Sequence, residues 1–287
     1  MGILIAGVSP HPPMLIPEIG GREIDKIRRT AEALKKLSAE IASRQPETVV
    51  FITPHGPMFQ EAPAVLADEE LAGDFSAFRA PGVILRAQND LELVQALAGE
   101  SRKEEIEVIL LRRGEQDFLR EEISLDHGVT VPLYFMQEAG TAQRCVAITF
   151  APLSFDALFR FGQALQRAIS VVDRKAAIVA SADLSHRLTR SAPAGYHPRG
   201  REYDDLVVES LTHYQVEKLL SIDKELVSDA GECGLRSLLI LLGSLSGLPV
   251  QSQLLSYEGP FGVGYPVALF TLPAQHTGPD KRVSGDG

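Results

Sequence analysis

The 287-residue chain has no tryptophan and only two cysteines, Cys145 and Cys233. Two cysteines exclude a disulfide framework and a zinc site built from cysteines alone. Such sparing use of cysteine is typical of a reducing compartment, so we expect a cytoplasmic protein.

Long apolar runs and an excess of basic residues are also missing. No stretch approaches the about 18 apolar residues of a membrane-spanning helix, and the N-terminus lacks the pattern of a signal peptide. The 28 basic residues are outnumbered by 38 acidic ones, which gives a formal net charge of -10. This balance excludes a general affinity for nucleic acid or anionic membranes, although a local arginine cluster can still hold an anionic substrate.

Short apolar runs alternate with amphipathic segments, which is typical of an α/β fold. The expected strands are 3–8, 48–52, 106–111, 145–150, 176–180, 254–257 and 267–272. The expected helices are 22–44, 90–98, 126–137, 155–170 and 229–246. Residues 60–87 are rich in proline and glycine and are expected to form a loop, with at most a short strand at 83–85.

These segments predict a single α/β domain over residues 1–273, with a central mixed and mostly parallel sheet flanked by helices. Two halves that meet near residue 150 are the alternative division. After Pro273 the sequence becomes polar and glycine-rich, so we expect residues 274–287 to be a disordered tail.

Three of the expected strands lead directly to a histidine. These are His11, His55 and His186, and prolines beside the first two restrict the backbone there. Ligands of open α/β sheets gather at the carboxyl ends of the strands, so we expect the three imidazoles to lie together. Because neutral imidazole binds iron, zinc, copper or nickel, the pattern predicts a metal site at this edge, with or without an acid/base histidine.

Two other segments carry candidate site residues. In Asp126-His127 the carboxylate can orient the imidazole, or it can simply cap a helix. Glu232 and Cys233 can each complete a metal shell. Two histidines with Glu232 would form the triad of non-haem Fe(II) oxygenases, whereas Cys233 would favour a softer or redox-active site.

The segment after the strand at 176–180 also contains Asp183 and Ser185. Ser185-His186 suggests a serine hydrolase, but the chain has no Gly-x-Ser-x-Gly elbow, which argues against one. His197 lies in a loop rich in arginine. It is a candidate for binding an anionic group of a substrate, and the alternative is a solvated charged loop.

Taken in order, these motifs resemble those of class III extradiol ring-cleavage dioxygenases, the LigB-like catalytic subunits. The resemblance runs from residue 3 to about residue 272 and rests on Pro10-His11-Pro12-Pro13, Thr53-Pro54-His55, Leu125-Asp126-His127-Gly128 with Val131-Pro132-Leu133, and Ser181-Ala182-Asp183-Leu184-Ser185-His186. The same superfamily contains Memo-like proteins, whose third metal ligand is a cysteine before a glycine. Cys233-Gly234 is similar to that pair.

The resemblance implies roles for individual residues. His11 and His55 correspond to metal ligands, and Glu232 or Cys233 to the third ligand. His186 corresponds to the acid/base residue, His127 to a second histidine that contacts substrate, and Asp183 to a polar residue of the pocket.

The resemblance also implies Fe(II) as cofactor, with zinc or another divalent metal able to replace it in a purified sample. The implied partners are a small aromatic diol, O2 and, in some relatives, a small accessory subunit. We also expect a homo-oligomer, because exposed helices on an α/β domain of this kind often pair. Ring cleavage is the first hypothesis. A Memo-like metal protein with a redox or partner-binding role is the second, and a zinc hydrolase is the third.

Overall fold

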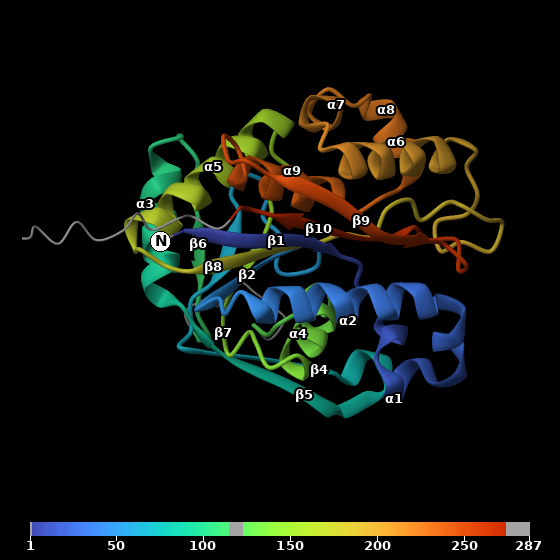
Figure 1. The fold of residues 1–287 in the computed structure, drawn as a ribbon, viewed down its shortest axis with the longest axis horizontal. Helices are drawn as coiled ribbons and strands as arrows, with labels where there is room; N and C mark the ends of the chain where they lie inside the picture. The colour runs from blue at the N-terminus through green and yellow to red at the C-terminus, as the bar shows by residue number, and fades with distance from the viewer. Residues whose placement is uncertain (1, 115–122, 274–287) are drawn as a thin grey trace, which may run out of the picture.

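The described residues form a ten-stranded mixed sheet at the centre of the molecule (Figure 1). The structure is a computed structural model that describes residues 2–114 and 123–273. Eight strands follow the order β4-β5-β7-β2-β8-β1-β10-β9, and the short strands β3 and β6 pair beside β7. Their bounds are β1 (Ile3–Ser9), β2 (Thr48–Thr53), β3 (Ala64–Leu66), β4 (Glu70–Phe75), β5 (Ala80–Asn89), β6 (Ile109–Leu111), β7 (Arg144–Thr149), β8 (Ala176–Ser181), β9 (Gln251–Glu258) and β10 (Tyr265–Thr271).

Helices cover both faces of this sheet, with α5 and α9 on one side and α2 and α4 on the other (Figure 1). The α-helices are α1 (Pro17–Gly20), α2 (Arg28–Ser43), α3 (Leu91–Arg102), α4 (His127–Glu138), α5 (Phe155–Val171), α6 (Arg199–His213), α7 (Val216–Leu220), α8 (Lys224–Ala230) and α9 (Leu235–Ser244). Short 3-10 helices occupy Pro13–Leu15, Gly21–Ile27 and Ser76–Phe78. The predicted single α/β domain with a mixed central sheet is thereby confirmed.

The four central strands β7, β2, β8 and β1 are mutually parallel, so their carboxyl ends lie along one edge of the sheet. The register pairs Thr53 with Thr149, and Ser9 with Ser181, at the last residue of each strand. The segments that contain His11, His55 and 182–186 therefore leave the sheet side by side. This is the arrangement that the sequence pattern predicts.

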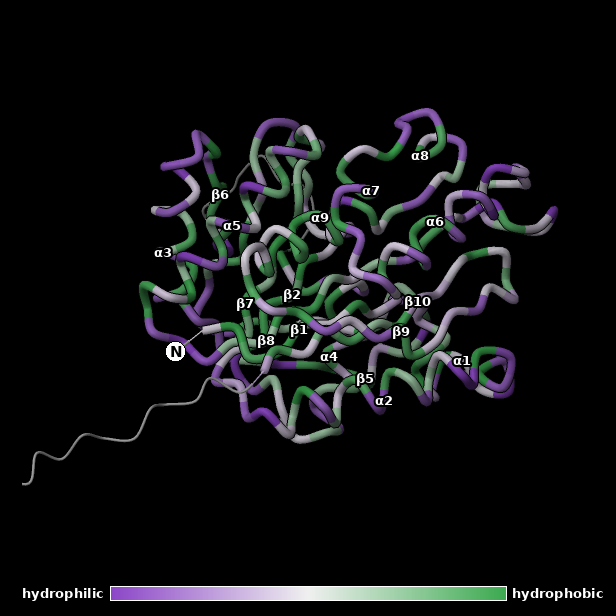
Figure 2. Tube along the Cα trace, turned by 45° about the horizontal axis from the view of Figure 1, so that its top comes forward, coloured by the Kyte–Doolittle hydropathy of each residue, from purple (hydrophilic) through white to green (hydrophobic). Residues whose placement is uncertain are grey.

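Successive side chains of the buried strands point to opposite faces of the sheet, so the interior consists of two apolar layers. In β2, Val49 and Phe51 pack with α2 and α4, whereas Val50 and Ile52 pack with α3, α5 and α9. The hydrophobic colours of Figure 2 gather on the central strands, and hydrophilic ones predominate on the outer turns. In the described part of the chain no helix is both long enough and apolar enough to cross a membrane.

Two local expectations are wrong. Residues 60–87 are not a loop, because β3, β4 and most of β5 lie there. Glycine in this segment does not mark a loop. Gly73 lies inside β4, and it is needed there because a Cβ atom would come within 2.4 Å of the carbonyl oxygen of Leu125. The helix expected at 229–246 begins only at Leu235, because the chain turns at residues 231–234. The tail expected at 274–287 lies outside the described residues.

Candidate metal centre

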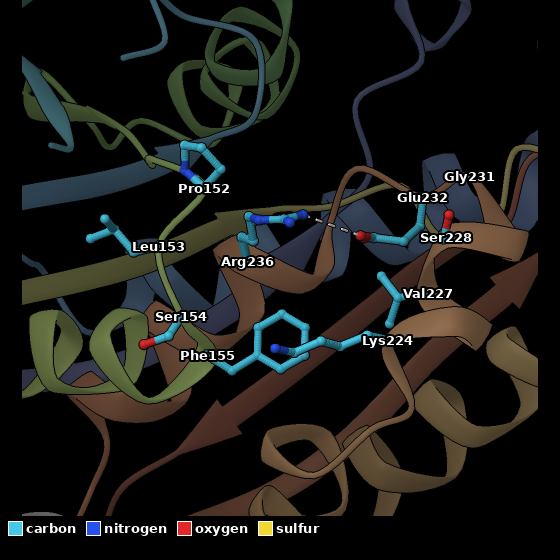
Figure 3. Close-up of a pocket in the computed structure, with 10 residues that line it drawn as sticks. All are labelled: Pro152, Leu153, Ser154, Phe155, Lys224, Val227, Ser228, Gly231, Glu232 and Arg236. Carbon is cyan, nitrogen blue, oxygen red and sulfur yellow. Dashed lines mark ion pairs between the residues drawn. The ribbon is translucent and has the colours of Figure 1, made fainter. Parts of the chain in front are cut away.

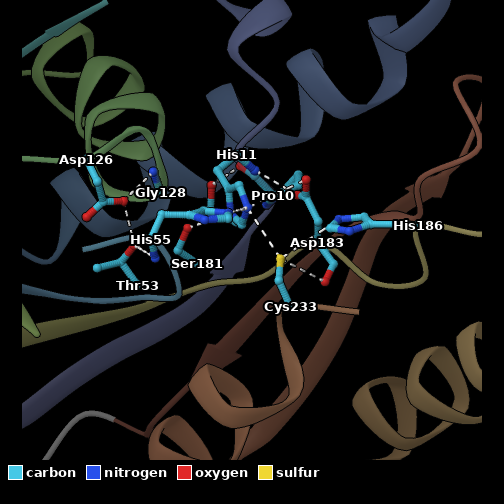
Figure 4. A network of polar contacts seen from close by, with 11 residues as sticks. Pro10, His11, Thr53, His55, Asp126, Gly128, Ser181, Asp183, His186 and Cys233 are labelled. Carbon is cyan, nitrogen blue, oxygen red and sulfur yellow. Dashed lines mark hydrogen bonds and ion pairs between the residues drawn. The ribbon is translucent and has the colours of Figure 1, made fainter. Parts of the chain in front are cut away.

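His11 follows β1 and is held by two groups at the end of the neighbouring strand β8. Its backbone N–H donates to Oδ1 of Asp183 at 2.9 Å, and its ring Nδ1 lies 2.8 Å from Oγ of Ser181. The ring is 2% exposed, so few other orientations are open to it. With Nδ1 engaged, Nε2 of His11 points toward His55 and Cys233 (Figure 4), and Oδ2 of Asp183 lies 3.6 Å from the same nitrogen.

His55 follows β2 and is fixed through the backbone. Its N–H donates to Oγ1 of Thr53 at 3.2 Å, and that hydroxyl donates to Oδ1 of Asp126 at 2.7 Å. Nε2 of His55 lies 3.0 Å from Nε2 of His11. His55 as a whole residue is more exposed than His11, so the cluster is open to solvent on this side.

Asp126 is the N-cap of α4, as the sequence predicts, and its Oδ1 accepts the N–H of Gly128 at 2.7 Å. A Cβ atom on Gly128 would come within 2.3 Å of Oγ1 of Thr53, so glycine permits this close approach of α4 to β2. Because the helix begins here, the ring of His127 stacks on that of His55 with centroids 4.2 Å apart.

Cys233 reaches the same cluster from the turn between α8 and α9. Its Sγ lies 3.6 Å from Nε2 of His11, 3.7 Å from the carbonyl oxygen of Asp183 and 4.0 Å from Nε2 of His186 (Figure 4). The ligand atoms of His11, His55 and Cys233 all lie within 4.8 Å of one another. Three segments that are far apart in the sequence thus bring two imidazoles and a thiol together.

Glu232 points away from this cluster. Its Oε2 accepts the N–H of Leu235 at 2.6 Å, as a carboxylate at the start of α9 does, and Oε1 lies 3.8 Å from Nη1 of Arg236 (Figure 3). The structure therefore does not bring Glu232 to the two histidines. His197 is also elsewhere, since its Nε2 faces Oδ1 of Asp229 at 3.9 Å.

Burial and mutual repulsion keep the histidines neutral. Burial lowers the pKa of His11 well below its usual range, and the neighbouring histidines lower it further. The same causes lower the pKa of His55 to about 4, and burial alone lowers the pKa of His127 to about 4. The pKa of His186 is lowered by burial as well. Neutral imidazoles are the form that binds metals and accepts protons.

The acidic groups of the cluster shift in the opposite direction. Burial raises the pKa of Asp183 to about 7, and the hydrogen bond from the N–H of His11 partly offsets this rise. Burial also raises the pKa of the Cys233 thiol, helped by the nearby carboxylates of Asp183 and Glu232. A cation is what would favour the thiolate here, so metal binding at this site would release a proton.

The donor types, together with the spacing of His11 and Cys233, suit a transition-metal ion. A nitrogen and a sulfur on one tetrahedral zinc ion lie roughly 3.6 Å apart, given bonds of about 2.0–2.1 Å and 2.3 Å. The distance between Nε2 of His11 and Sγ of Cys233 is 3.6 Å. Two imidazoles and one thiolate suit zinc, iron or copper.

The fold and these residues define an α/β protein with a candidate His-His-Cys metal site at the carboxyl edge of its sheet. The chain belongs to the LigB family, described as the catalytic LigB subunit of aromatic ring-opening dioxygenase, which matches residues 6–268.

Two individual proteins are also similar to this chain. Protein CA_C1420 of Clostridium acetobutylicum is 39% identical over 258 residues, which are 90% of this chain and 55% of that protein. The chain thus spans about half the length of this curated relative. The crystal structure of the uncharacterized protein JW3007 from Escherichia coli K12 matches with a TM-score of 0.54 and 17% identity, over 93% of this chain and 99% of that one. At this identity the likeness shows the fold alone.

The sequence alone does not identify some residues of the site. Ser181 and Thr53 were visible within the motifs, but nothing in the sequence says that they hold a histidine ring or its backbone. Phe78 lies within 5.2 Å of the ring of His127, centroid to centroid, and comes from a segment expected to be a loop. A short aromatic segment after an edge strand gives no signal of this contact.

Proposed function

We propose that this protein is a metal-dependent oxidoreductase in which His11, His55 and Cys233 hold one transition-metal ion. The observation that supports it is the position of Cys233, whose Sγ lies 3.6 Å from Nε2 of His11 while Glu232 bonds to Leu235. A thiolate in place of a carboxylate favours a softer, redox-active centre. The proposal corresponds to a Memo-like protein with a redox role.

The residues around the ion have separate tasks in this proposal. A bound ion would supply Lewis-acid and redox chemistry to a small substrate. His186 lies beside the ligands with Nε2 4.0 Å from Sγ of Cys233, and it would exchange a proton with the substrate at this nitrogen. His127 would orient the substrate from the side of His55, on which its ring stacks. Asp183 would keep His11 in place through the backbone N–H.

Extradiol cleavage of a catechol-type diol with Fe(II) and O2 is the second candidate function. The placement of two further histidines beside the ligands favours it, because ring opening needs one base that takes a diol proton and later returns it. In this reaction His186 would move the proton, His127 would contact the substrate, and both atoms of O2 would enter the product. The description of the family also supports this candidate.

Oxygen uptake by anaerobically purified protein loaded with Fe(II) separates the two candidates. A redox centre without ring cleavage predicts that the metal cycles between oxidation states, and that no catechol gives a yellow ring-opened product. Ring cleavage predicts oxygen uptake with at least one diol and loss of this uptake in His186→Ala. Turnover of an ester or amide without O2 would contradict both candidates and favour a zinc hydrolase.

We also propose that the protein works in a reducing cytoplasm as a homo-oligomer. Both cysteines are free, which supports the first part. Light scattering of the purified protein, with and without co-expressed small proteins, checks the oligomeric state and the small accessory subunit that the family resemblance implies.

A further inference from the structure

A cavity of about 600 Å³ lies beside the turn that contains Cys233, on the side to which Glu232 points (Figure 3). Its walls come from the segment after β7, from α8 and from the first turn of α9. None of the clustered histidines lines it. The cavity is therefore separate from the candidate metal centre, although consecutive residues of one turn face the two sites.

Two cations line this cavity, and neither donates a hydrogen bond to a carboxylate among the described residues, although Arg236 forms an ion pair with Glu232. Lys224 forms no ion pair with any residue in the described ranges, and Nε of Arg236 is buried without a hydrogen-bond partner among them. The approach of Arg236 to Glu232 is 3.8 Å, beyond hydrogen-bond distance. By contrast, Arg199 donates to Asp223 and Asp229 at 2.9 Å each.

A charged donor without an acceptor costs free energy when it is partly buried, so an anion that supplies the acceptor stabilises the site. The guanidinium of Arg236 is planar and matches the two oxygens of a carboxylate. The guanidinium of Arg236 also contacts an aromatic ring, since its central carbon lies 6.0 Å from the centre of the Phe150 ring.

The remaining walls combine apolar side chains with polar groups. Leu153, Phe155 and Val227 line the cavity, and Ser154 and Ser228 add hydroxyl groups. A cavity of several hundred cubic ångströms has the size of a site for a small organic molecule, and the three apolar side chains offer a surface for the apolar part of such a molecule. Highly charged anions fit less well, because the carboxylate of Glu232 also lines the cavity and pairs with Arg236.

We propose that this cavity binds a small organic anion, whose carboxylate contacts Lys224 and Arg236 and whose apolar body packs on Leu153, Phe155 and Val227. The site is additional to the metal centre, and the proposal does not depend on the reaction at that centre.

Calorimetric titration of the full chain with benzoate, acetate and inorganic phosphate tests the proposal. Benzoate is expected to bind more tightly than acetate or phosphate, because only benzoate fills the apolar part. Lys224→Gln and Arg236→Gln should each weaken benzoate binding by about tenfold or more, which is the effect of losing one charge-assisted hydrogen bond. Lys224 is a surface position, so its variant stays informative if Arg236→Gln fails to fold.

Two controls locate the binding. Lys175→Gln removes a cation from the other large cavity, at the opposite end of the strands, and should leave benzoate affinity unchanged. His55→Ala disrupts the metal centre and should leave it unchanged as well. Absence of saturable benzoate binding, loss of binding in either control variant, or a preference for phosphate over benzoate would each overturn the proposal.

Discussion

At the scale of single residues, hydrogen bonds from the ends of β2 and β8 hold the two candidate ligands, His55 at its backbone N–H and His11 at its ring. Ser181 and Ser9 are paired neighbours at the ends of β8 and β1, yet only Ser181 contacts the ring of His11, while Ser9 donates to the carbonyl oxygen of Pro10. Loss of a group that orients a ligand in this way typically costs about 10–100-fold in metal affinity.

We predict that Ser181→Ala weakens metal binding by about 10–100-fold, because His11 loses the partner of its Nδ1. Competition with a chelator of known affinity measures the change. Ser9→Ala is the matched control and should keep the affinity of the wild type. Equal affinities for the two variants would show that Ser181 does not orient the ring.

At the scale of elements, the packing of α9 on α5 positions the turn that contains Cys233. The two helices approach closely at glycines, since a Cβ atom on Gly243 would lie 2.0 Å from the carbonyl oxygen of Phe159. A backbone atom cannot move aside as a flexible side chain can, so any larger residue must separate the helices.

Gly243→Ala should therefore lower the free energy of unfolding by about 1–3 kcal/mol. Gly99→Ala is its control, because Gly99 lies in α3 with open space around it, and alanine there should stabilise the helix by up to about 1 kcal/mol. Denaturant unfolding measures both changes. Opposite signs support the packing described, and a neutral Gly243→Ala would refute it.

Helix α6 joins the loop after β8 to strand β9 through one buried carboxyl group. Asp204 accepts hydrogen bonds from the N–H of Ser185 at 2.8 Å and from the hydroxyl of Tyr257. Burial raises the pKa of Asp204 to about 7, although both hydrogen bonds act in the opposite direction.

This shift predicts a pH-dependent stability. Between about pH 4 and pH 7 the folded protein keeps a proton on Asp204 that the unfolded chain has released, so the contribution of Asp204 to the unfolding free energy falls as the pH rises through this range. Asp204→Asn removes this pH-dependent contribution. The difference in unfolding free energy between the variant and the wild type should therefore shift in favour of the variant by about 1–3 kcal/mol from pH 4 to pH 7. Thermal unfolding at both pH values measures it, and a difference independent of pH would contradict the shift.

At the scale of the whole molecule, the sequence predicts the sheet well because its central strands are short, continuous apolar runs. It also predicts that His11, His55 and the segment at 181–186 meet, since parallel strands place their ends together. It fails at β4, where Gly73 serves a close backbone contact rather than a loop, and at β5. It leaves Glu232 and Cys233 undecided, because only the turn before α9 determines which of the two side chains faces the histidines.

The candidate metal site connects segments from both ends of the chain, so metal binding should stabilise the entire domain. An ion at about 100 times its dissociation constant adds about 2.7 kcal/mol, or roughly 5–10 °C in Tm for a domain of this size. Thermal unfolding with zinc or with a chelator measures the shift. His55→Ala should abolish most of this shift in Tm. A wild-type Tm that is the same with zinc and with the chelator would argue against a site formed only in the folded state.

In the proposed metal centre the thiolate of Cys233, rather than the carboxylate of Glu232, is the third ligand. X-ray absorption spectroscopy of zinc- or iron-loaded protein tests it most directly, since a sulfur ligand scatters at about 2.3 Å and nitrogen or oxygen ligands at about 2.0–2.2 Å. We predict one sulfur ligand in the wild type and in Glu232→Gln, and none in Cys233→Ser. A wild-type spectrum without a sulfur ligand, together with loss of the metal in Glu232→Gln, would exclude Cys233 as a ligand and favour a centre of two histidines and one carboxylate.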